Sequence, residues 1–521
     1  MLNTCDYPDS VAFLGQWGRF QQVVFFLLCA SIVPNGFGAF NLVFLTDAPG
    51  HRCSVPDVGL TEDWRAAIIP VQVVNGNQQL SRCSRFRLDV VRNLSAQGLV
   101  PGRDVNLTDL EQEGCVDGWS YSRDVYQSTI VSEFDLVCSE QWKLTFISTV
   151  FFVGVLLGSF FSGQLSDRFG RKPVLFLTMG VQMVFTFIQV FSTSWIMFTV
   201  LLFINGLGQI SNFVAALVLG TEILTGHVRV LYSSMGACLS FTLGYMMLPG
   251  CAYLLRDWTS LLLALSLPCL AYLPLWWFIP ESPRWLLSQG RVEEAESIVR
   301  KAAKWNKVQA PLVIFQDYTR VFGDSRVLYW PLASPRFATC TGYYGLSFNT
   351  SQLHADPYMS CFISAAVEVP AYISGWLVLR YFPRRRSICC SLLLQAVSLF
   401  LIQLVPQTLP YLSIALEMLA KYFVTITFSM MFAYIAELYP TLLRNTAVGV
   451  CSTVGRLGNC IAPFLITLNT YVLHLPYIII GTLGCVAALA ALYIPESFGQ
   501  PLPETIQQMH KRERWALYTE F

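Results

Sequence analysis

Charged side chains are scarce in this sequence of 521 residues. They make up 13% of it, while 54% of the residues are hydrophobic and the mean hydropathy is +0.50. Soluble domains carry about 25% charged residues. Histidine is also rare: the five residues are scattered without the spacing of metal ligands. With no nucleophile–base arrangement and no basic cluster of the kind that binds nucleic acid, the sequence predicts no enzyme, no cofactor and no nucleic-acid partner.

What the sequence has instead is long apolar runs. Eleven runs approach or exceed the roughly 20 residues that a helix needs to cross a bilayer. They predict an all-α, multi-pass membrane protein. The runs are residues 23–45, 144–163, 174–192, 195–219, 230–254, 258–279, 361–379, 388–405, 412–436, 447–468 and 476–494.

A polar segment at residues 46–143 separates the first two runs. It holds two N-glycosylation sequons, at Asn93 and Asn106, and four cysteines. An even number of cysteines together with sequons indicates an oxidising, extracellular side. Four cysteines allow three pairings, and the sequence does not choose among them. The disulfide candidates are Cys53, Cys83, Cys115 and Cys138.

Basic residues cluster in short loops, after the second run and after the run at 361–379. The positive-inside rule places both clusters in the cytoplasm. Residues 291–304, with acids early and bases late, predict an amphipathic surface helix. The expected order is a cytoplasmic N-terminus (1–22), the first span (23–45), the extracellular loop (46–143), the rest of an N-terminal half (144–280), a cytoplasmic linker (281–330), a C-terminal half (331–494) and a cytoplasmic tail (495–521).

The chain repeats itself at an offset of 212 to 215 residues. Two parallel halves of this kind are typical of a transporter that rocks around a midplane site, and they argue against a receptor or a membrane enzyme. The repeated features are the string at 163–172 with its weaker copy at 375–386, the pairs Glu222/Arg229 and Glu437/Arg444, and Pro-Glu-Ser at 280–282 and 495–497.

Several strings resemble known families. GQLSDRFGRK at 163–172 resembles the loop signature of the major facilitator superfamily, and PESPRWL at 280–286 that of sugar and organic-ion facilitators. With the cysteine-bearing loop and the tail at 495–504, the chain resembles solute carrier family 22. AFLGQWGRFQ, PNGFG, FFVGVLLGSFFSGQLSDRFGRK and VEVPAY resemble its organic cation/carnitine transporter branch. The residues that match the gating motif are Gly163, Asp167, Arg168, Gly170 and Arg171.

The resemblance implies a major facilitator fold with two six-helix halves. It also implies sodium-linked transport of carnitine-like zwitterions and organic cations across the plasma membrane. An organic-anion carrier, or a sodium-independent carrier, is the alternative. The final Thr519-Glu-Phe521 fits the termini that PDZ modules bind.

Few ionisable residues lie inside the apolar runs. Glu417 and Lys421 are four apart on one helix face, so we expect them to neutralise each other. Glu368 is then the only acid left for Arg456. Either these two form a structural bridge, or Arg456 binds a substrate carboxylate through both of its donors. We favour the second, and the resemblance also implies an arginine at this place.

A substrate ammonium would need aromatic faces, although aromatics in spans more often serve packing. The candidates are Phe241, Tyr245, Tyr343, Tyr344, Phe428 and Phe432. Phe213, beside Asn212, stands where the resembling branch usually has tyrosine. Asn35 follows a helix-breaking proline, and Gln209 and Asn212 share a helix face. The resemblance implies that Asn35 and Asn212 belong to a sodium and substrate region, with Gln209 and Glu437 as further coupling candidates, while interhelical hydrogen bonding is the alternative for the amides.

One crossing lacks an apolar run. Basic residues require a span between Trp285 and Met359, yet the best run, 337–348, has 12 residues and would cover about 18 Å of a roughly 30 Å core. A full seventh span occupies this place in the resembling family. We therefore predict a truncated seventh span with Tyr343 and Tyr344 poorly anchored, low surface abundance and weak transport.

Overall fold

The computed structural model describes residues 7–56, 59–74, 77–311, 314–315, 330–349, 356–406, 408–438, 441–469, 472 and 474–497. The chain divides into two compact units. The helical unit comprises Met1–Val43, Ile147–Leu254 and Leu261–Phe521, and the loop unit comprises Phe44–Phe146 with Leu255–Ser260.

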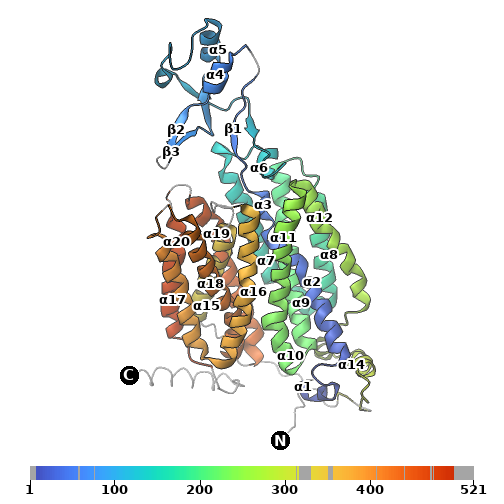
Figure 1. Cartoon of the computed structure of the whole chain (residues 1–521). Coiled ribbons are helices and arrows are strands. Elements are labelled where there is room, and N and C mark those ends of the chain that lie inside the picture. Colours follow the sequence, from blue (N-terminus) through green and yellow to red (C-terminus); the bar gives the residue numbers. More distant parts are fainter. Residues whose placement is uncertain are drawn as a thin grey trace. The chain divides into compact units, whose positions relative to one another are not determined.

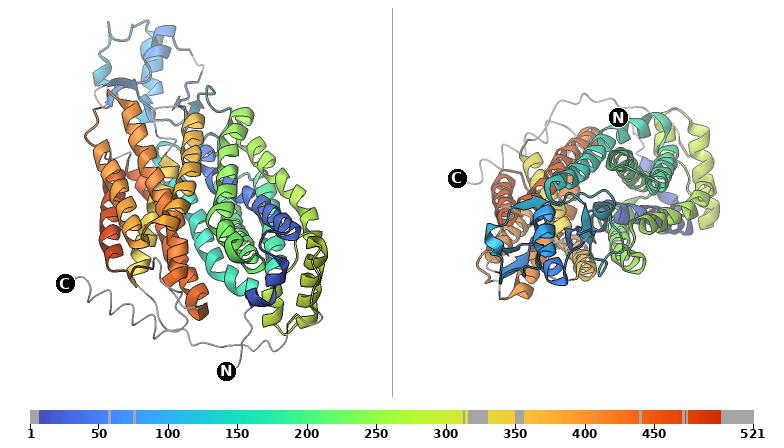
Figure 2. Two further views of the ribbon diagram at one scale, coloured as in Figure 1. Left: turned by 60° about the horizontal axis from the view of Figure 1, so that its bottom comes forward. Right: turned by 90° about the horizontal axis from the view of Figure 1, so that it is seen from above.

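Long helices form the membrane part in two sets, which Figure 1 shows in blue to green and in yellow to red, and Figure 2 from two further directions. The first set is α2 (Arg19–Phe40) with α3 (Leu42–Leu45), α7 (Trp142–Phe169), α8 (Arg171–Gln189), α9 (Trp195–Ile223), α10 (Gly226–Leu231) joined through the π-turn η4 (Tyr232–Gly236) to α11 (Ala237–Leu255), and α12 (Trp258–Tyr272) with the 3-10 turn η5 (Leu273–Trp277). The second is α15 (Trp330–Phe348), α16 (Pro357–Tyr381), α17 (Arg384–Ile402), α18 (Pro410–Leu438), α19 (Thr441–Leu468) and α20 (Leu475–Leu492).

All eleven predicted spans coincide with apolar helices. Within the described residues, eleven helical segments are long and apolar enough to cross a membrane, from Arg19–Leu45 to Leu475–Leu492, and each overlaps one predicted run. Their cores are two separate clusters of buried apolar side chains, one per half. The predicted surface helix is also confirmed, as α14 (Val292–Asn306), with Glu293 and Glu294 in its first turn and Lys304 in its last.

The helix at the incomplete seventh span is longer than its apolar run. Helix α15 has 19 residues, or about 28 Å, because Trp330–Arg336 is helical although it is not apolar. The side chain of Tyr343 is 1% exposed, and its hydroxyl is hydrogen-bonded. Tyr344 packs edge to face on Phe152, with ring centroids 5.3 Å apart. The expectation that Tyr343 and Tyr344 are poorly anchored is therefore wrong, because helical geometry continues through residues that hydropathy does not select.

Glycines allow the closest helix contacts. A Cβ on Gly36 of α2 would lie 1.9 Å from the carbonyl oxygen of Phe241, and one on Gly244 of α11 would lie 2.1 Å from that of Val33. Such distances are impossible for any larger residue, so α2 and α11 touch through their backbones. Helix α19 also approaches α15 closely at two glycines: a Cβ on Gly458 would lie 2.8 Å from the Phe337 carbonyl oxygen, and one on Gly455 would lie 2.8 Å from Cys340 Sγ.

Short helices α1 (Tyr7–Ser10), η1 (Ala12–Leu14) and α13 (Pro283–Ser288) pack with α14 at one end of the helical unit. The amide of Asn306, the last residue of α14, accepts from Phe20 N–H (2.9 Å) and donates to the Leu14 carbonyl (3.1 Å) and to Gln21 Oε1 (2.8 Å). These bonds attach the end of α14 to the beginning of α2.

The loop unit contains three two-stranded antiparallel sheets, β1–β6, β2–β3 and β4–β5. Trp64, Ile68, Phe86 and Val91 form its small core. Disulfides join Cys53 to Cys115 and Cys83 to Cys138. The elements are β1 (His51–Cys53), α4 (Glu62–Ala67), β2 (Val71–Val74), β3 (Asn77–Leu80), β4 (Ser84–Phe86), α5 (Leu88–Ala96), η2 (Leu107–Asp109), β5 (Gln112–Gly114), β6 (Trp119–Tyr121), α6 (Ile130–Glu133) and η3 (Cys138–Glu140).

Candidate functional site

A cavity lies between the two sets of long helices. Its empty space is about 810 Å³, counting the part open to solvent. Residues from α2, α7, α9, α11, α15, α16, α18 and α19 line it. Nine of the predicted site residues are among them: Asn35, Gln209, Phe213, Phe241, Tyr343, Tyr344, Phe428, Phe432 and Arg456.

Two predicted site residues lie outside this lining, and both are buried nearby. Tyr245 stacks on Phe40, with ring centroids 3.9 Å apart, and its hydroxyl donates to Ser364 Oγ at 3.3 Å. Asn212 accepts a hydrogen bond from Asn35 Nδ2 (2.8 Å) and donates to the Leu175 carbonyl (3.0 Å). A third, Glu437, belongs to α18, and its side chain lies outside the described residues.

The acids of the spans are engaged away from Arg456. Glu368 accepts from Tyr343 OH (2.7 Å) and Thr242 Oγ1 (2.9 Å), and its Oε1 lies 3.2 Å from Lys421 Nζ. Glu417 instead accepts from Asn349 and from Tyr477. The expected Glu417–Lys421 ion pair is therefore wrong: a second helix, α16, supplies the carboxylate that Lys421 bonds, which spacing along α18 does not reveal.

Arg456 consequently has no acidic partner in the part of the chain that the structure describes. The alternative in which Arg456 forms a structural bridge to Glu368 is not observed, since Glu368 is paired with Lys421. A guanidinium that lines a cavity without a carboxylate can bind a carboxylate arriving from outside, through two parallel hydrogen bonds.

Aromatic rings line the same cavity. Tyr343 stacks on Phe428, with centroids 5.0 Å apart, and Phe428 meets Phe432 edge to face at 5.7 Å. Phe213 and Phe241 form a second edge-to-face pair at 6.0 Å. The cavity therefore offers a guanidinium, which can bind a carboxylate, and aromatic faces of the kind that bind a quaternary ammonium, although the Arg336 guanidinium already lies over Phe428 and Phe432.

Sequence reasoning missed Arg336. It lies in the first part of α15, 2% exposed, and lines the cavity with Arg456. The residue stands directly before the apolar run 337–348, in a stretch that matched no family string, so it was not counted among the charges inside spans. Its position one residue before that run was the available signal.

The amides expected near a sodium site form a buried cluster. Gln209 Nε2 donates to the backbone carbonyl of Asn35 at 2.8 Å, and Asn35 Nδ2 donates to Asn212. The side-chain oxygen of Asn35 is buried and has no hydrogen-bond partner among the residues that the structure describes. This oxygen belongs to a cavity-lining residue and is free to accept from, or coordinate, a cation.

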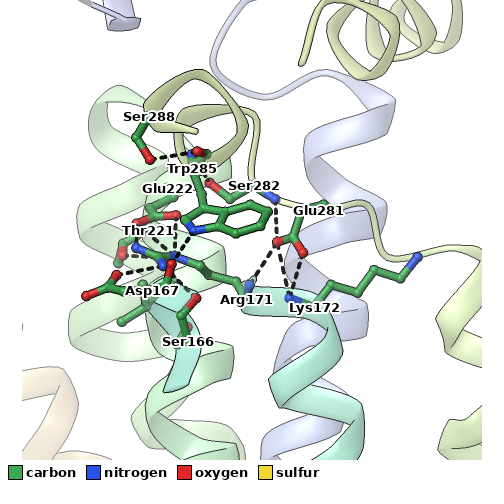
Figure 3. A network of polar contacts seen from close by, with 11 residues as sticks. Ser166, Asp167, Arg171, Lys172, Thr221, Glu222, Glu281, Ser282, Trp285 and Ser288 are labelled. Atoms are coloured by element: carbon green, nitrogen blue, oxygen red, sulfur yellow. Dashed lines mark hydrogen bonds and ion pairs between the residues drawn. The ribbon is translucent and has the colours of Figure 1, made fainter. Parts of the chain in front are cut away.

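The predicted gating motif forms a network at the ends of α7, α8 and α9 (Figure 3). Arg171 pairs with Asp167 at 2.7 Å and with Glu222 at 3.0 Å. Gly170 has φ of 103°, and a Cβ there would lie 2.6 Å from Glu281 Oε2. Arg168 is exposed, and its guanidinium lies beside the ring of Phe169. Gly163 faces open space among the described residues, since a Cβ added there would have no atom within 4 Å.

Glu281, next to this network, accepts hydrogen bonds from the backbone N–H groups of Arg171 (3.0 Å) and Lys172 (3.1 Å), at the first turn of α8 (Figure 3). Glu496 does the same for Arg384 (2.8 Å) and Arg385 (3.1 Å), at the first turn of α17. The two Pro-Glu-Ser strings are therefore equivalent in structure: each carboxylate satisfies the free N–H groups of a helix start.

In the loop unit, both sequon asparagines are exposed. Asn93 lies on α5, and Asn106 precedes the turn η2, where its Oδ1 accepts from Thr108 N–H at 3.3 Å.

Comparisons with known proteins agree with this architecture. Residues 112–321 match the family described as Sugar (and other) transporter, and residues 359–516 match the Major Facilitator Superfamily. The solved structure of the proton:xylose symporter XylE has a TM-score of 0.60 and 15% identity, covering 93% of this chain and 98% of that one. At this identity the likeness shows the fold alone.

Curated relatives are much more similar. Organic cation/carnitine transporter 2 of Rattus norvegicus is 52% identical over 522 residues, covering 97% of this chain and 94% of the relative. The Homo sapiens protein of that name and Solute carrier family 22 member 4 of Mus musculus are each 50% identical over 97% of this chain, with 94% and 95% of their own lengths covered. The chain therefore belongs to solute carrier family 22 of the major facilitator superfamily, in its organic cation/carnitine transporter branch, as a multi-pass membrane transporter rather than an enzyme.

Proposed function

We propose that the chain carries carnitine-like zwitterions and organic cations across the plasma membrane by alternating access, linked to sodium. The observation that supports it most is Arg456, which lines an aromatic cavity without an acidic partner among the described residues. The substrate's carboxylate would bind this guanidinium, and its ammonium an aromatic face. The names of the relatives, organic cation/carnitine transporters, point to the same class.

The network around Arg171 supports alternating access. It joins α7, α8 and α9 because the buried Arg171 pairs with the exposed Asp167 and with the partly buried Glu222. Exposed ion pairs contribute little stability, so such a network can break and re-form as two halves rock about a central site.

The amide cluster supports sodium coupling. The unpartnered side-chain oxygen of Asn35 and the nearby Gln209 and Asn212 offer the neutral oxygens that coordinate alkali cations in transporters. Glu437 is the further coupling candidate, from sequence alone.

Glycosylation at Asn93 and Asn106 and a PDZ partner at Thr519–Phe521 are also proposed, the latter outside the described residues.

The second candidate is an organic-anion carrier that uses the same cavity. Arg336 favours it, since a second guanidinium makes the cavity more attractive to anions.

Uptake of labelled carnitine into cells that express the chain tests the proposal. We expect saturable uptake that falls at least severalfold when mannitol replaces sodium chloride. Uptake that is equal with and without sodium would reject the coupling, and binding without accumulation would reject transport itself.

A further inference from the structure

We propose that Arg336 is a specificity residue: its guanidinium occupies the aromatic site that a substrate's ammonium would use, and so shifts selection from quaternary ammonium toward carboxylate. This rests on that part of the proposed function in which substrates bind in the cavity of Arg456. The chain then carries its own cation, tethered to α15, as a competitor of cationic substrates.

The geometry is that of a filled cation–π site. The guanidinium carbon of Arg336 lies 3.8 Å from the ring centroid of Phe432 and 4.5 Å from that of Phe428. Both distances are well within the roughly 6 Å limit of the interaction. Nη1 also donates to the Phe428 carbonyl at 3.2 Å. A trimethylammonium group could not approach these two faces while the guanidinium remains there.

Helix packing holds the arginine in place. A Cβ on Gly455 would lie 2.8 Å from Cys340 Sγ and 3.1 Å from Cγ of Arg336. The stem of Arg336 therefore lies directly against α19, beside the residue that precedes Arg456. Both guanidiniums then line one cavity.

The charge of Arg336 has no counterion in the described part of the chain. Its Nε has no hydrogen-bond partner among those residues, and the span acids Glu368 and Glu417 are bonded elsewhere. An unpaired buried charge is unfavourable. A substrate carboxylate relieves this at Arg336 as well as at Arg456, whereas an ammonium adds a third positive charge.

Three labelled probes test the inference: tetraethylammonium, carnitine and glutarate. In the wild-type chain we expect tetraethylammonium to be the poorest of the three. In Arg336→Gln, tetraethylammonium uptake relative to carnitine should rise about tenfold, since a desolvated cation–π site becomes free, and glutarate uptake should fall. Arg336→Lys keeps the charge and should retain the wild-type order.

Arg380→Gln is the matched control. Arg380 is exposed at the end of α16, and its guanidinium also lies over aromatic rings, at 5.7 Å from Trp376 and 5.6 Å from Tyr381. Its removal should leave the uptake ratios unchanged. All rates are divided by surface abundance, measured by biotinylation.

Carnitine uptake with an unchanged tetraethylammonium ratio in Arg336→Gln would overturn this inference alone. Uptake of none of the probes by the wild-type chain would overturn the proposed function, and the inference with it. If Arg336→Gln does not reach the surface, ligand-induced thermal stabilisation of the purified wild-type protein tests the inference instead. Its melting temperature should rise more with glutarate than with tetraethylammonium, and the reverse order would refute the role of Arg336.

Discussion

Lys421 Nζ lies 3.2 Å from Glu368 Oε1, and both side chains are 0% exposed. The ammonium also donates to Ser347 Oγ and Ser364 Oγ, at 2.5 and 2.8 Å. This pair, between α18 and α16, engages the only carboxylate that the sequence left for Arg456. Because Glu368 is paired with Lys421, it does not neutralise Arg456, which lines the cavity.

The Glu368–Lys421 pair leads to a stability prediction. Glu368→Gln leaves a buried ammonium without its counterion, which costs about 3–5 kcal/mol. We expect a clear fall in the melting temperature of the purified protein. Glu417→Gln is the control and should lower the melting temperature less, since the hydrogen bonds to Glu417 come from neutral donors, Asn349 and Tyr477. The double variant Glu368→Gln/Lys421→Met should recover much of the loss; no recovery would argue against the pair.

Arg456→Ala should reduce carnitine uptake by at least tenfold at equal surface abundance. A charge-assisted bond to a carboxylate contributes about 1.5–3 kcal/mol, and this one would be bidentate. Arg456→Lys keeps the charge without the planar fork, so it should retain a fraction of the uptake. In an Arg336→Gln background, tetraethylammonium uptake should survive the loss of Arg456, because this probe has no carboxylate. If Arg456→Ala binds carnitine with unchanged affinity, Arg456 does not belong to the substrate site.

The two helix-capping glutamates should have equivalent effects. Glu281→Ala and Glu496→Ala each leave N–H groups at a helix start without their acceptor, and cap losses cost about 0.5–2 kcal/mol. We expect each variant to melt at a lower temperature, and the double variant to show the sum, because distant sites are additive. Glu294→Ala, an exposed acid on α14, is the comparison and should change little. A large effect of only one cap would contradict their equivalence.

Asp47 should make the stability of the loop unit depend on pH. Burial raises the pKa of this carboxyl from 3.8 to about 6, although Tyr126 OH donates to it at 2.8 Å. The folded state then binds the proton more tightly than the unfolded state. The contribution to the free energy of unfolding therefore falls as pH rises from about 4 to about 6, and is constant above.

Hydrogen exchange of the loop unit in the full chain, corrected for intrinsic rates, measures this slope. Asp47→Asn should reduce the pH dependence of protection, whereas Asp124→Asn, at an exposed position, should leave it unchanged. A wild-type unit that becomes steadily more protected from pH 4 to 6 would show the opposite sign.

Local sequence determined much of this protein. Each of the eleven apolar helices depends on apolar length, which is a property of consecutive residues, and the repeated strings were enough to indicate two halves. Helix α14 follows in the same way from its period and terminal charges. Among the expected spans, hydropathy was insufficient at α15, where the helix includes Trp330–Arg336 although this stretch is not apolar, and where Arg336 packs against Gly455 of α19.

Tertiary structure decided the pairings. The sequence allowed three disulfide patterns and placed Lys421 beside Glu417, but the partner of Lys421 comes from another helix, 53 positions earlier in the chain. Arg336 enters the cavity only through the contact of α15 with α19 and α18. Which charge meets which acid or ring depends on how helices distant in sequence pack. One chain's spacing does not encode that, because each side chain's partner is set by the fold as a whole.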